Sequence, residues 1–600
     1  MRILFRLNPY LWRYRVRFFS GLLCAVIAAG FALSVPGVIR RTVDAVAHMI
    51  VQYQDVQGSS LEGSVYVYFA LSLLGYALLI LGLSLLSGLF LFFMRYLVVG
   101  VSRDIEYDLR NDLYAHLQKL SMRFFHRYPT GDLITRATSD VEQVRRYMGP
   151  AIMYATRALV TVLVAISFMV TISPTLTFYA MLPMPLLALS VFWVAHTIHR
   201  RSEAIQRQYS RLTSHVQEAL AGIRVIKAYV REPWETQTFE EESERYRQKA
   251  MALARVDAAW RPVFLLLVGA STLLVIGMGG NLVIQGRLTV GNIAEYIVYV
   301  ALMTWPVASL GFVISLIQRA AASAERIFEV LDTSPEIQDT ERTHFAITRI
   351  QGDLVFDGVW FRYHEHQDWV LRDISFRLPA GGMLGIVGRT GSGKSTLIEL
   401  IPRLIEPVRG KVCVDGHDIR EIPLRVLRSA IGYVPQEVFL FSDTIARNIA
   451  FGVDEERMKE IERAAMEAEL LENIQHFPHR FETRVGERGV MLSGGQKQRT
   501  SIARALIRRP RILILDDALS AVDTRTETRI LEHLYRQRGQ RSLIVVSHRI
   551  SAVQQADLIL VLDEGRIVEQ GTHRDLLKQD GLYASLYRKQ LLEQELANLQ

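Results

Sequence analysis

The first half of the chain alternates long apolar runs with strongly polar segments, whereas the second half does not. Six runs have the roughly 20 residues that a helix needs to cross a bilayer. They are Phe18–Val38, Val65–Val99, Pro150–Ile172, Thr175–His196, Pro262–Ile284 and Ile293–Ile317. No run of this length recurs farther along the chain. The pattern predicts six transmembrane helices and a membrane part that ends near Arg319.

Two of the connecting segments are long and rich in arginine and lysine, namely Tyr107–Pro150 and Ile198–Arg261. The other connections carry almost no positive charge, although Arg40 and Arg41 lie at the outer end of the first run. Because positively charged loops stay on the cytoplasmic side, we place both long loops and both termini in the cytoplasm. No signal peptide is evident. The orientation fits a multi-pass protein of a cell inner (plasma) membrane, with an organellar membrane as the alternative.

Each basic loop is too long for a turn and lacks the glycine, serine and proline content of a linker. Helical stretches flank a short broken centre, at Phe124–Asp132 in the first loop and at Tyr229–Glu235 in the second. We therefore expect the membrane helices to continue into the cytoplasm. There they fold back through short cross-helices that can dock on a soluble domain.

The whole pattern divides the chain into five parts. They are an amphipathic N-terminal helix (1–17), a transmembrane domain (18–331), a polar linker (332–350), an α/β domain (351–585) and a C-terminal tail (586–600). The α/β domain is indicated by short β-rich runs that alternate with helical ones.

Composition narrows the class of protein further. Half of the 600 residues are hydrophobic and 22% are charged, which excludes a disordered chain and fits a soluble enzyme poorly. Cys24 and Cys413 are too few for a disulfide framework or a metal site, and we expect them to fill apolar space. The net charge of +8 follows from the basic loops, so nucleic-acid binding is not needed to explain it.

The α/β domain contains a phosphate-loop pattern, GxxxxGK[ST], directly after the apolar strand Leu384–Val387. Its residues are Gly388, Arg389, Thr390, Gly391, Ser392, Gly393, Lys394, Ser395 and Thr396. The glycines let backbone N–H groups wrap phosphates, and a helix that starts at Gly393 points its positive end at them. Lys394 would reach the terminal phosphates and Ser395 would bind Mg²⁺. A second apolar strand ends in Asp516, a further oxygen ligand for Mg²⁺.

Between these two elements, Leu492–Gln496 reads Leu-Ser-Gly-Gly-Gln, which resembles the signature of ABC (ATP-binding cassette) ATPases. Other motifs of that family follow the expected order along the chain. They are Tyr363 (the aromatic that stacks on adenine), Gln436 (Q-loop), Thr483–Gly489 (the exporter segment before the signature), Ser520–Asp523 (D-loop) and His548 (switch histidine). With six helices upstream, nearly the entire chain resembles an ABC exporter half-transporter.

The resemblance implies a polytopic α-helical membrane domain fused to an α/β phosphate-loop ATPase that uses ATP and Mg²⁺. It implies that Ser493, Gly494, Gly495 and Gln496 bind the ATP held by a partner's phosphate loop, so that two cassettes work as a dimer. It also gives Gln436 a role at Mg²⁺ and at the membrane domain.

The chain departs from the family at Asp517, where a glutamate normally polarises the attacking water. Aspartate is one methylene shorter, and a base that misses its reach of about 2.6–3.2 Å forfeits much of a ~10²–10⁴-fold contribution. We therefore predict ATP binding with slow hydrolysis at this site, as in the degenerate subunit of heterodimeric multidrug half-transporters. The partner would supply the glutamate. The alternatives are a homodimer in which Asp517 is the base, and a regulatory subunit that binds ATP and gates a partner.

The exported molecule is the least specified part of the function. Charged residues are few within the spans, and they are Arg95, Arg157 and Glu295. Tyr296, Tyr299 and Met303 recur at helical spacing, which fits core packing first and an apolar substrate cavity second. The expected substrates are hydrophobic or amphipathic, and drugs, lipids and peptides all fit.

Overall fold

The computed structural model describes every residue except 1, 60–61, 365, 487–491 and 600. It contains two compact units, which are described separately below. The first unit is Met1–Gln118 with Thr130–Thr333, and the second is Lys119–Pro129 with Ser334–Gln600. The segment that precedes Thr130 thus belongs with the C-terminal half of the chain.

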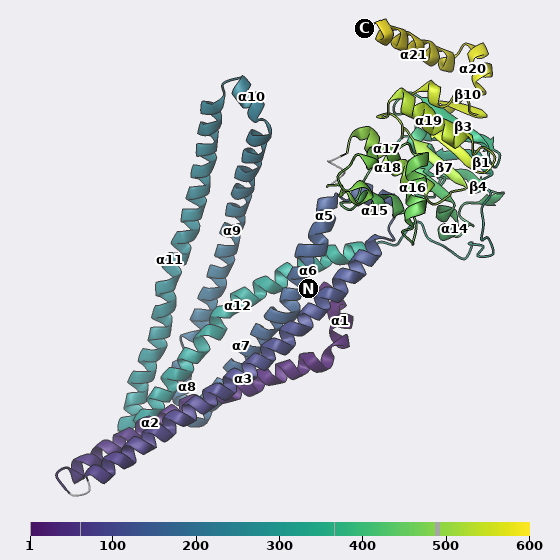
Figure 1. The fold of residues 1–600 in the computed structure, drawn as a ribbon. Coiled ribbons are helices and arrows are strands. Elements are labelled where there is room, and N and C mark those ends of the chain that lie inside the picture. Colours follow the sequence, from purple (N-terminus) through teal and green to yellow (C-terminus); the bar gives the residue numbers. More distant parts are fainter. Residues whose placement is uncertain (1, 60–61, 365, 487–491, 600) are drawn as a thin grey trace. The chain divides into compact units, whose positions relative to one another are not determined.

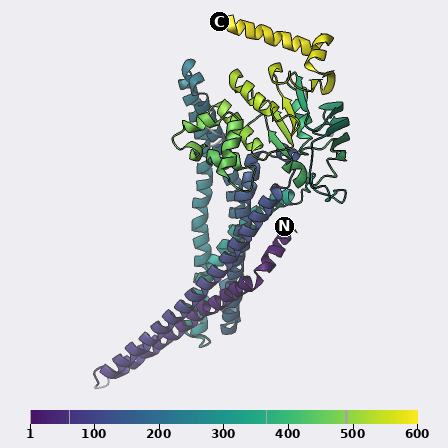
Figure 2. The same ribbon diagram turned by 45° about the vertical axis from the view of Figure 1, so that its right-hand side comes forward.

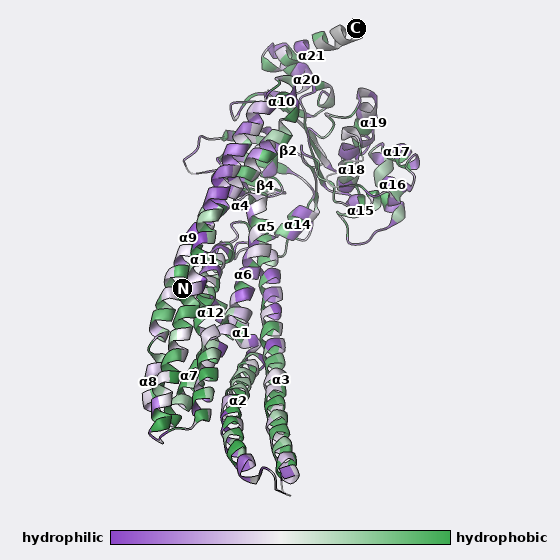
Figure 3. Cartoon of the chain, turned by 90° about the vertical axis from the view of Figure 1, so that its left-hand side faces the viewer, coloured by the Kyte–Doolittle hydropathy of each residue, from purple (hydrophilic) through white to green (hydrophobic). Residues whose placement is uncertain are grey.

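The first unit contains six helices that are long and apolar enough to cross a membrane, as predicted. They are α2 (Arg15–Val56), α3 (Glu62–Leu117), a composite helix over Thr130–Ile172, α8 (Pro174–Met181) with α9 (Met184–Ala221), α11 (Glu232–Ile284) and α12 (Val290–Leu331). At 1.5 Å per residue the 56 residues of α3 reach about 84 Å, far more than the ~30 Å of a bilayer core. Figure 3 shows α9 and α11 changing from hydrophobic near α8 to hydrophilic near α10. Figures 1 and 2 show α2 and α3 side by side.

The third membrane helix is interrupted by two π-helical segments. Along the chain it consists of α5 (Thr130–Thr135), η2 (Arg136–Asp140, π), α6 (Val141–Arg146), η3 (Tyr147–Ala151, π) and α7 (Ile152–Ile172). The buried carboxylate of Asp140 accepts a hydrogen bond of 2.8 Å from Ser323 and pairs with Arg326. Arg136 donates to Glu329 at 2.7 Å. These polar contacts hold the π-helical region to α12.

Both predicted cross-helices are present, but the second lies earlier in the chain than predicted. The first is α4 (Met122–Arg127), which overlaps the predicted Phe124–Asp132. The second is α10 (Ile223–Ala228), so the predicted segment Tyr229–Glu235 contains the following turn and the start of α11. The break after α9 falls at Gly222, and the turn after α10 contains Val230 with a positive φ of 54°.

The N-terminal segment is not a single amphipathic helix ending at residue 17. It forms η1 (Arg2–Leu7, 3₁₀) and α1 (Asn8–Arg13), and α2 has already begun at Arg15. Three of its five arginines are paired with carboxylates of the same unit. The pairs are Arg6–Asp332 at 2.6 Å, Arg13–Asp108 at 3.0 Å and Arg17–Asp104 at 2.8 Å. The segment is therefore bound to α3 and to the end of α12.

The positive charge of Arg40, within α2, has a partner inside the protein. Arg40 Nε lies 3.6 Å from a carboxylate oxygen of Glu295, whose side chain is buried on α12. Near it, the carboxylate of Asp44 accepts hydrogen bonds from the Gly291 backbone N–H at 2.9 Å and from the Thr289 hydroxyl at 2.8 Å. Arg40 therefore serves to join α2 to α12.

The aromatic stripe of the last membrane helix is part of the packed core. Tyr296, Tyr299 and Met303 are at most 1% exposed. The Tyr299 hydroxyl donates to the carbonyl of Leu33 on α2 at 3.1 Å. Core packing is therefore the interpretation of this stripe that the structure supports.

The second unit is an α/β domain with two sheets. An antiparallel sheet has the order β2-β1-β4-β5, and a six-stranded sheet has the order β10-β9-β3-β8-β7-β6. The strands are β1 (Leu354–Phe361), β2 (Leu371–Leu378), β3 (Met383–Gly388), β4 (Arg409–Val414), β5 (His417–Asp418), β6 (Ile431–Val434), β7 (Ile512–Asp516), β8 (Ser542–Val546), β9 (Leu558–Asp563) and β10 (Arg566–Gly571). Strands β3, β7 and β8 are buried along their whole length.

Nine further helices belong to the described part of the second unit. They are α13 (Lys394–Glu399), α14 (Leu424–Ser429), α15 (Ile445–Ala450), α16 (Met458–Glu467), α17 (Leu471–Gln475), α18 (Gly494–Leu506), α19 (Thr524–Tyr535), α20 (His573–Gln579) and α21 (Leu582–Leu599). Two 3₁₀ turns, η4 (Arg480–Glu482) and η6 (Ile550–Ala552), complete the unit. The fold confirms the predicted combination of a six-helix membrane domain and an α/β domain.

Candidate nucleotide site and transport pocket

The phosphate loop and the later motifs meet at one edge of the six-stranded sheet. Its strands β3, β8, β7 and β6 are parallel, and Asp516 and Ile386 both pair with Val546. Gly388, Asp516 and the loops after β6 and β8 therefore all lie at the carboxyl ends of these strands. This edge is where ligands bind in open α/β sheets.

The phosphate loop has the backbone that its glycines predict. Gly391 and Gly393 have φ values of 82° and 93°, and α13 begins at Lys394, one residue later than predicted. The buried ammonium of Lys394 donates to the carbonyls of Gly388 at 2.9 Å and Arg389 at 2.8 Å, so the side chain folds back over its own loop. Burial lowers the pKa of Lys394.

One buried hydroxyl in this loop has no protein partner. The Ser392 side chain is 4% exposed, and its oxygen makes no hydrogen bond among the described residues. An orphaned buried donor is uncommon in a folded protein. A phosphate oxygen would satisfy it, so the residues present fit a nucleotide.

The side chains of Ser395 and Asp516 are joined by a hydrogen bond. Burial raises the pKa of Asp516, and the Ser395 hydroxyl opposes this rise. The two side chains offer a hydroxyl and a carboxylate oxygen at the phosphate loop, which is the type of ligand that Mg²⁺ prefers. The donor set therefore fits a magnesium ion that accompanies a nucleotide.

Tyr363 lies against the phosphate-loop helix. Its hydroxyl and that of Thr396 are 3.0 Å apart, and burial raises the pKa of the phenol. Its ring meets Phe361 edge-on at 5.0 Å between centroids and meets His126, on the cross-helix α4, at 5.9 Å. The position is compatible with stacking on a base. Its contact with His126 also joins the first cross-helix to the cassette of the same chain.

Asp517 follows the buried Asp516 with a backbone in the left-handed region, at φ 45°. Its N–H donates to the carbonyl of Val546 at 2.9 Å, and its carbonyl accepts from the Ser520 hydroxyl at 2.9 Å. The backbone on both sides of the carboxylate is therefore fixed. The carboxylate of Asp517 raises the pKa of Lys394, against the effect of burial. The two side chains are therefore close enough to interact electrostatically.

Gln436 and His548 are exposed on the loops after β6 and β8. Among the described residues, no hydrogen bond or ion pair holds either side chain. His548 lowers the pKa of Asp516, which places it within electrostatic range of the Mg²⁺ ligand set. Both side chains are able to rotate toward a nucleotide at this edge.

The signature motif forms the start of α18 and does not line the phosphate loop. Ser493 caps the helix, accepting from the Gln496 N–H at 3.3 Å, while the Gln496 side chain accepts from the Ser493 N–H at 3.0 Å. A Cβ on Gly495 would lie 2.8 Å from the carbonyl oxygen of Ala521, so the D-loop packs directly on this glycine. Within the described part of the chain, no hydrogen bond joins Ser493, Gly494, Gly495 or Gln496 to the loop 388–396.

The exporter segment Thr483–Gly489 is described only in part, because 487–489 lie outside the described residues. The carbonyl of Thr483 accepts a hydrogen bond from the Ile445 N–H at 3.0 Å, and the Val485 N–H donates to the carbonyl of Asp443 at 2.8 Å. The described residues therefore run beside the start of α15.

Sequence reasoning missed the buried side chain of Gln498 on α18. It donates to the Ser520 hydroxyl at 3.0 Å and accepts from the Ala521 N–H at 2.9 Å. The signal was present, because a second glutamine stands two positions after the signature. Its role shows only in the fold, which brings the D-loop onto α18.

Sequence reasoning also missed Arg549, next to the switch histidine. It pairs with the buried carboxylate of Glu527 on α19 and donates to the carbonyls of Ser520 at 3.2 Å and Val522 at 3.3 Å. The loop after β8 is thereby tied to the D-loop.

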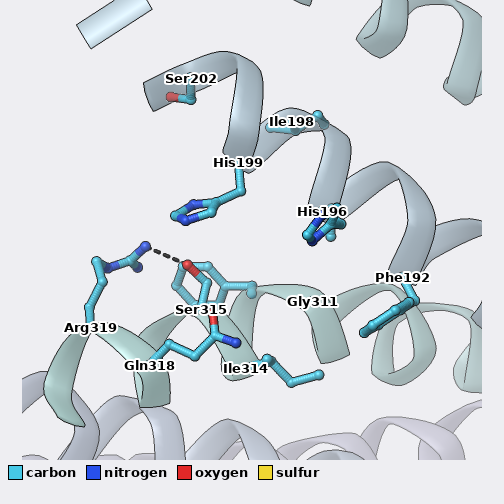
Figure 4. A pocket seen from close by; sticks show the side chains of 12 residues that line it. Phe192, His196, Ile198, His199, Ser202, Gly311, Ile314, Ser315, Gln318 and Arg319 are labelled. Carbon is cyan, nitrogen blue, oxygen red and sulfur yellow. Dashed lines mark hydrogen bonds between the residues drawn. The ribbon is translucent and has the colours of Figure 1, made fainter. Parts of the chain in front are cut away.

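The membrane unit has a pocket of about 430 Å³ between α9 and α12. It lies at the C-terminal ends of the predicted spans Thr175–His196 and Ile293–Ile317. Figure 4 shows its polar side chains, which are His196, His199, Ser202, Ser315, Gln318 and Arg319. Arg319 donates to the Ser315 hydroxyl, and within the described residues no carboxylate pairs with it. Phe192 and Ile314 supply an apolar side.

Two further charged positions in the spans differ in environment. Arg95 is exposed on α3. Arg157 lies over the ring of Trp305, 5.8 Å from its centroid, and lines a second pocket of about 200 Å³. Arg157 is therefore held against α12, whereas no such contact involves Arg95 among the described residues.

Comparison with known proteins agrees with these sites. Residues 18–307 match the family model described as ABC transporter transmembrane region, and residues 371–520 match the model described as ABC transporter. The chain is 36% identical to the multidrug resistance-like ATP-binding protein MdlA of Escherichia coli (strain K12), over 99% of this chain and 97% of that protein. It is 37% identical to the ATP-dependent lipid A-core flippase of Chromohalobacter salexigens, over 86% of this chain and 89% of that protein.

A solved structure described as a bacterial Atm1-family ABC exporter with ATP bound is similar in fold. It has a TM-score of 0.77 and 29% sequence identity, over 96% of this chain and 98% of that chain. Both the membrane helices and the cassette are thus shared with a known exporter. The chain belongs to the ABC exporters, as a half-transporter with one membrane domain and one ATPase domain.

Proposed function

We propose that this chain is one half of a heterodimeric, ATP-driven exporter of hydrophobic or amphipathic molecules, and that its own nucleotide site hydrolyses ATP slowly. The observation that carries the proposal is Asp517, which stands beside Lys394 and Asp516 where the family has a glutamate. Every other described element of the site is in place. The proposed partner supplies the missing glutamate, and the signature of this chain completes the partner's site.

Within the cassette, the backbone of the phosphate loop and Lys394 bind and orient the phosphates, and Tyr363 supports the base. Ser395, Asp516 and Gln436 hold Mg²⁺, which neutralises charge on the phosphate oxygens when it is bound. Asp517 and His548 lie beside these groups. Because the side chain of Asp517 is one methylene shorter than glutamate, its carboxylate does not reach the attacking water. The general-base contribution to the rate is lost, while nucleotide binding stays intact.

The cargo follows from the pocket between α9 and α12. An apolar side with Phe192 and a polar side with the Arg319 cation and two histidines suit an amphipathic molecule with an anionic or polar group. The names of the relatives, a multidrug resistance-like protein and a lipid A-core flippase, support drugs and lipids as classes of cargo. The arginine distribution supports a cytoplasmic ATPase domain under an inner or plasma membrane.

The heterodimer is tested by isolating the chain from the membranes of its own cells in mild detergent. The proposal predicts that a second half-transporter is recovered in equal amount. Its sequence should carry glutamate directly after the Mg²⁺ aspartate. Recovery of this chain only, as a pair of identical copies, contradicts the proposal.

The cargo is tested by fluorescence binding of anionic and neutral amphiphiles to the purified chain. Loss of a charge-assisted contact in Arg319→Gln should weaken binding of the anionic probe about tenfold and leave the neutral probe unchanged. The matched control is Arg287→Gln, an exposed arginine outside the pocket. Equal effects of the two substitutions contradict the assignment.

A further inference from the structure

Three metal-ligating side chains converge in the cassette, outside the nucleotide site. They are His344 in the linker, His417 on β5 and Glu421 in the segment after β5. One nitrogen from each histidine and one carboxylate oxygen all lie within 4.8 Å of one another. The histidines are exposed and the glutamate is half-buried. All three therefore reach solvent and are open to an incoming ion.

The backbone around these side chains is fixed by hydrogen bonds. The His344 N–H donates to the carbonyl of Glu421 itself, at 2.7 Å. The linker is held at a second point nearby, where the Leu424 N–H donates to the carboxylate of Asp339 at 2.9 Å. Ile422, next to the glutamate, is buried. The convergence is thus a property of the packed fold and does not depend on a free loop.

None of the three side chains is used elsewhere in the described structure. No hydrogen bond or ion pair of the described residues involves the imidazoles of His344 and His417 or the carboxylate of Glu421. The neighbouring acid, Asp418, behaves differently, because Arg420 occupies both of its oxygens. The lone pairs of the three converging groups are therefore available.

We propose that His344, His417 and Glu421 form a binding site for a divalent transition-metal ion, with Zn²⁺ as the best-fitting ion. Two imidazole nitrogens and one carboxylate oxygen are a common zinc ligand set, and water fills the fourth position. Tetrahedral zinc needs ligand atoms about 3.3 Å apart, so the side chains would close in by at most about 1.5 Å from separations within 4.8 Å. Mg²⁺ prefers oxygen ligands in an octahedral arrangement, so it does not compete here.

The site joins two parts of the chain that are far apart in sequence. His344 belongs to the linker that follows the last membrane helix, whereas His417 and Glu421 belong to the antiparallel sheet of the cassette. An ion bound by all three ties the linker to that sheet. Because such a site does not exist in the unfolded chain, binding raises the stability of the folded cassette.

The test uses the full-length chain in detergent, purified with a histidine-free tag and stripped of metal with a chelator. Zinc uptake is measured by competition with a chromophoric chelator, in the presence of excess Mg²⁺. The site variant is His344→Ala/His417→Ala. The matched control is His479→Ala, an exposed histidine elsewhere in the cassette.

The proposal predicts one zinc ion per chain that the control retains and that the site variant binds more than roughly tenfold more weakly. Zinc should also raise the thermal midpoint of the control and not that of the site variant. The thermal midpoints of the two variants without metal show whether both are equally folded before zinc is added. Equal zinc affinity and equal thermal shifts in the two variants overturn the proposal. Absence of any zinc binding by the unaltered chain overturns it as well.

Discussion

Asp517 combines a short side chain with a left-handed backbone. Aspartate and asparagine tolerate positive φ better than longer residues because their side chains bond locally. Replacing Asp517 by glutamate therefore adds a strain of about 1 kcal/mol at most. This is less than the several kcal/mol that correspond to a ~10²–10⁴-fold change in rate, so a glutamate placed here should still act as a base.

At the residue scale, Gln498 provides a second test. Gln498→Ala leaves the Ala521 N–H without its partner and releases the Ser520 hydroxyl. A buried unsatisfied group of this kind destabilises a fold by about 1–3 kcal/mol. We predict a lower thermal midpoint of the cassette in the full-length chain, measured by calorimetry, together with weaker completion of the partner's ATP site.

The control is Lys497→Ala, the adjacent residue, whose side chain is half-exposed and makes no hydrogen bond among the described residues. Both variants shorten a long side chain on the same helix. If Lys497→Ala lowers the midpoint as much as Gln498→Ala does, the contact between α18 and the D-loop is not the cause.

The sequence was sufficient to predict residues whose role is local. The phosphate loop and Asp516 stand in contiguous motifs, so their arrangement follows from a strand, a turn and a helix. Gln498 and Arg549 were not predicted because their partners are backbone groups, a serine hydroxyl and a buried glutamate on other elements. Only the packing of α18 and α19 against the D-loop defines those contacts.

At the scale of elements, the pair Arg40–Glu295 joins α2 to α12. Glu295 is buried and Arg40 is half-buried, so removing the arginine leaves a buried charge without its partner, at a cost below the ~3–5 kcal/mol of a fully buried pair. We therefore expect Arg40→Met to lower the thermal midpoint of the detergent-purified chain strongly. The double variant Arg40→Met/Glu295→Met should recover most of that loss, because it removes both charges.

Arg41→Met is the matched control for this prediction. Arg41 stands next to Arg40 and is exposed, and it makes no ion pair among the described residues. We expect a change within about 0.5 kcal/mol, typical of a surface substitution. A large loss in Arg41→Met, or no recovery in the double variant, would show that Arg40 and Glu295 are not coupled.

Helix number could be predicted from the sequence, but helix ends could not. The six spans are long apolar runs, and length with composition identifies them. The second cross-helix lies before the predicted segment because the break is set by Gly222 and Val230, whereas Pro233 belongs to the first turn of α11 and is tolerated there. The N-terminal segment is divided where Pro9 stands in the first turn of α1 and where Tyr14 leaves helical geometry before α2.

For the whole molecule, nucleotide binding and hydrolysis should separate. A ligand that binds only the folded state at 100 times its Kd adds about 2.7 kcal/mol to stability. We expect Mg-ATP to raise the thermal midpoint of the unaltered chain and of Asp517→Asn by similar amounts. Lys394→Ala removes the phosphate contact, and its midpoint should not respond to Mg-ATP. Scanning fluorimetry measures all three.

If Mg-ATP does not raise the thermal midpoint of Asp517→Asn, binding and hydrolysis do not separate, since that variant keeps every group assigned to nucleotide binding. A persistent response in Lys394→Ala would show that the nucleotide is held elsewhere.

The central claim is that this half-transporter binds ATP at a site that hydrolyses it slowly because its base is an aspartate. The most direct measurement is steady-state Mg-ATP hydrolysis by the chain purified alone, beside Asp517→Glu and Asp517→Asn. The account predicts a low rate for the unaltered chain, no further loss in Asp517→Asn, and a rise of at least roughly tenfold in Asp517→Glu. Rapid turnover by the lone chain that Asp517→Asn abolishes would contradict it and identify Asp517 as the working base of a homodimer.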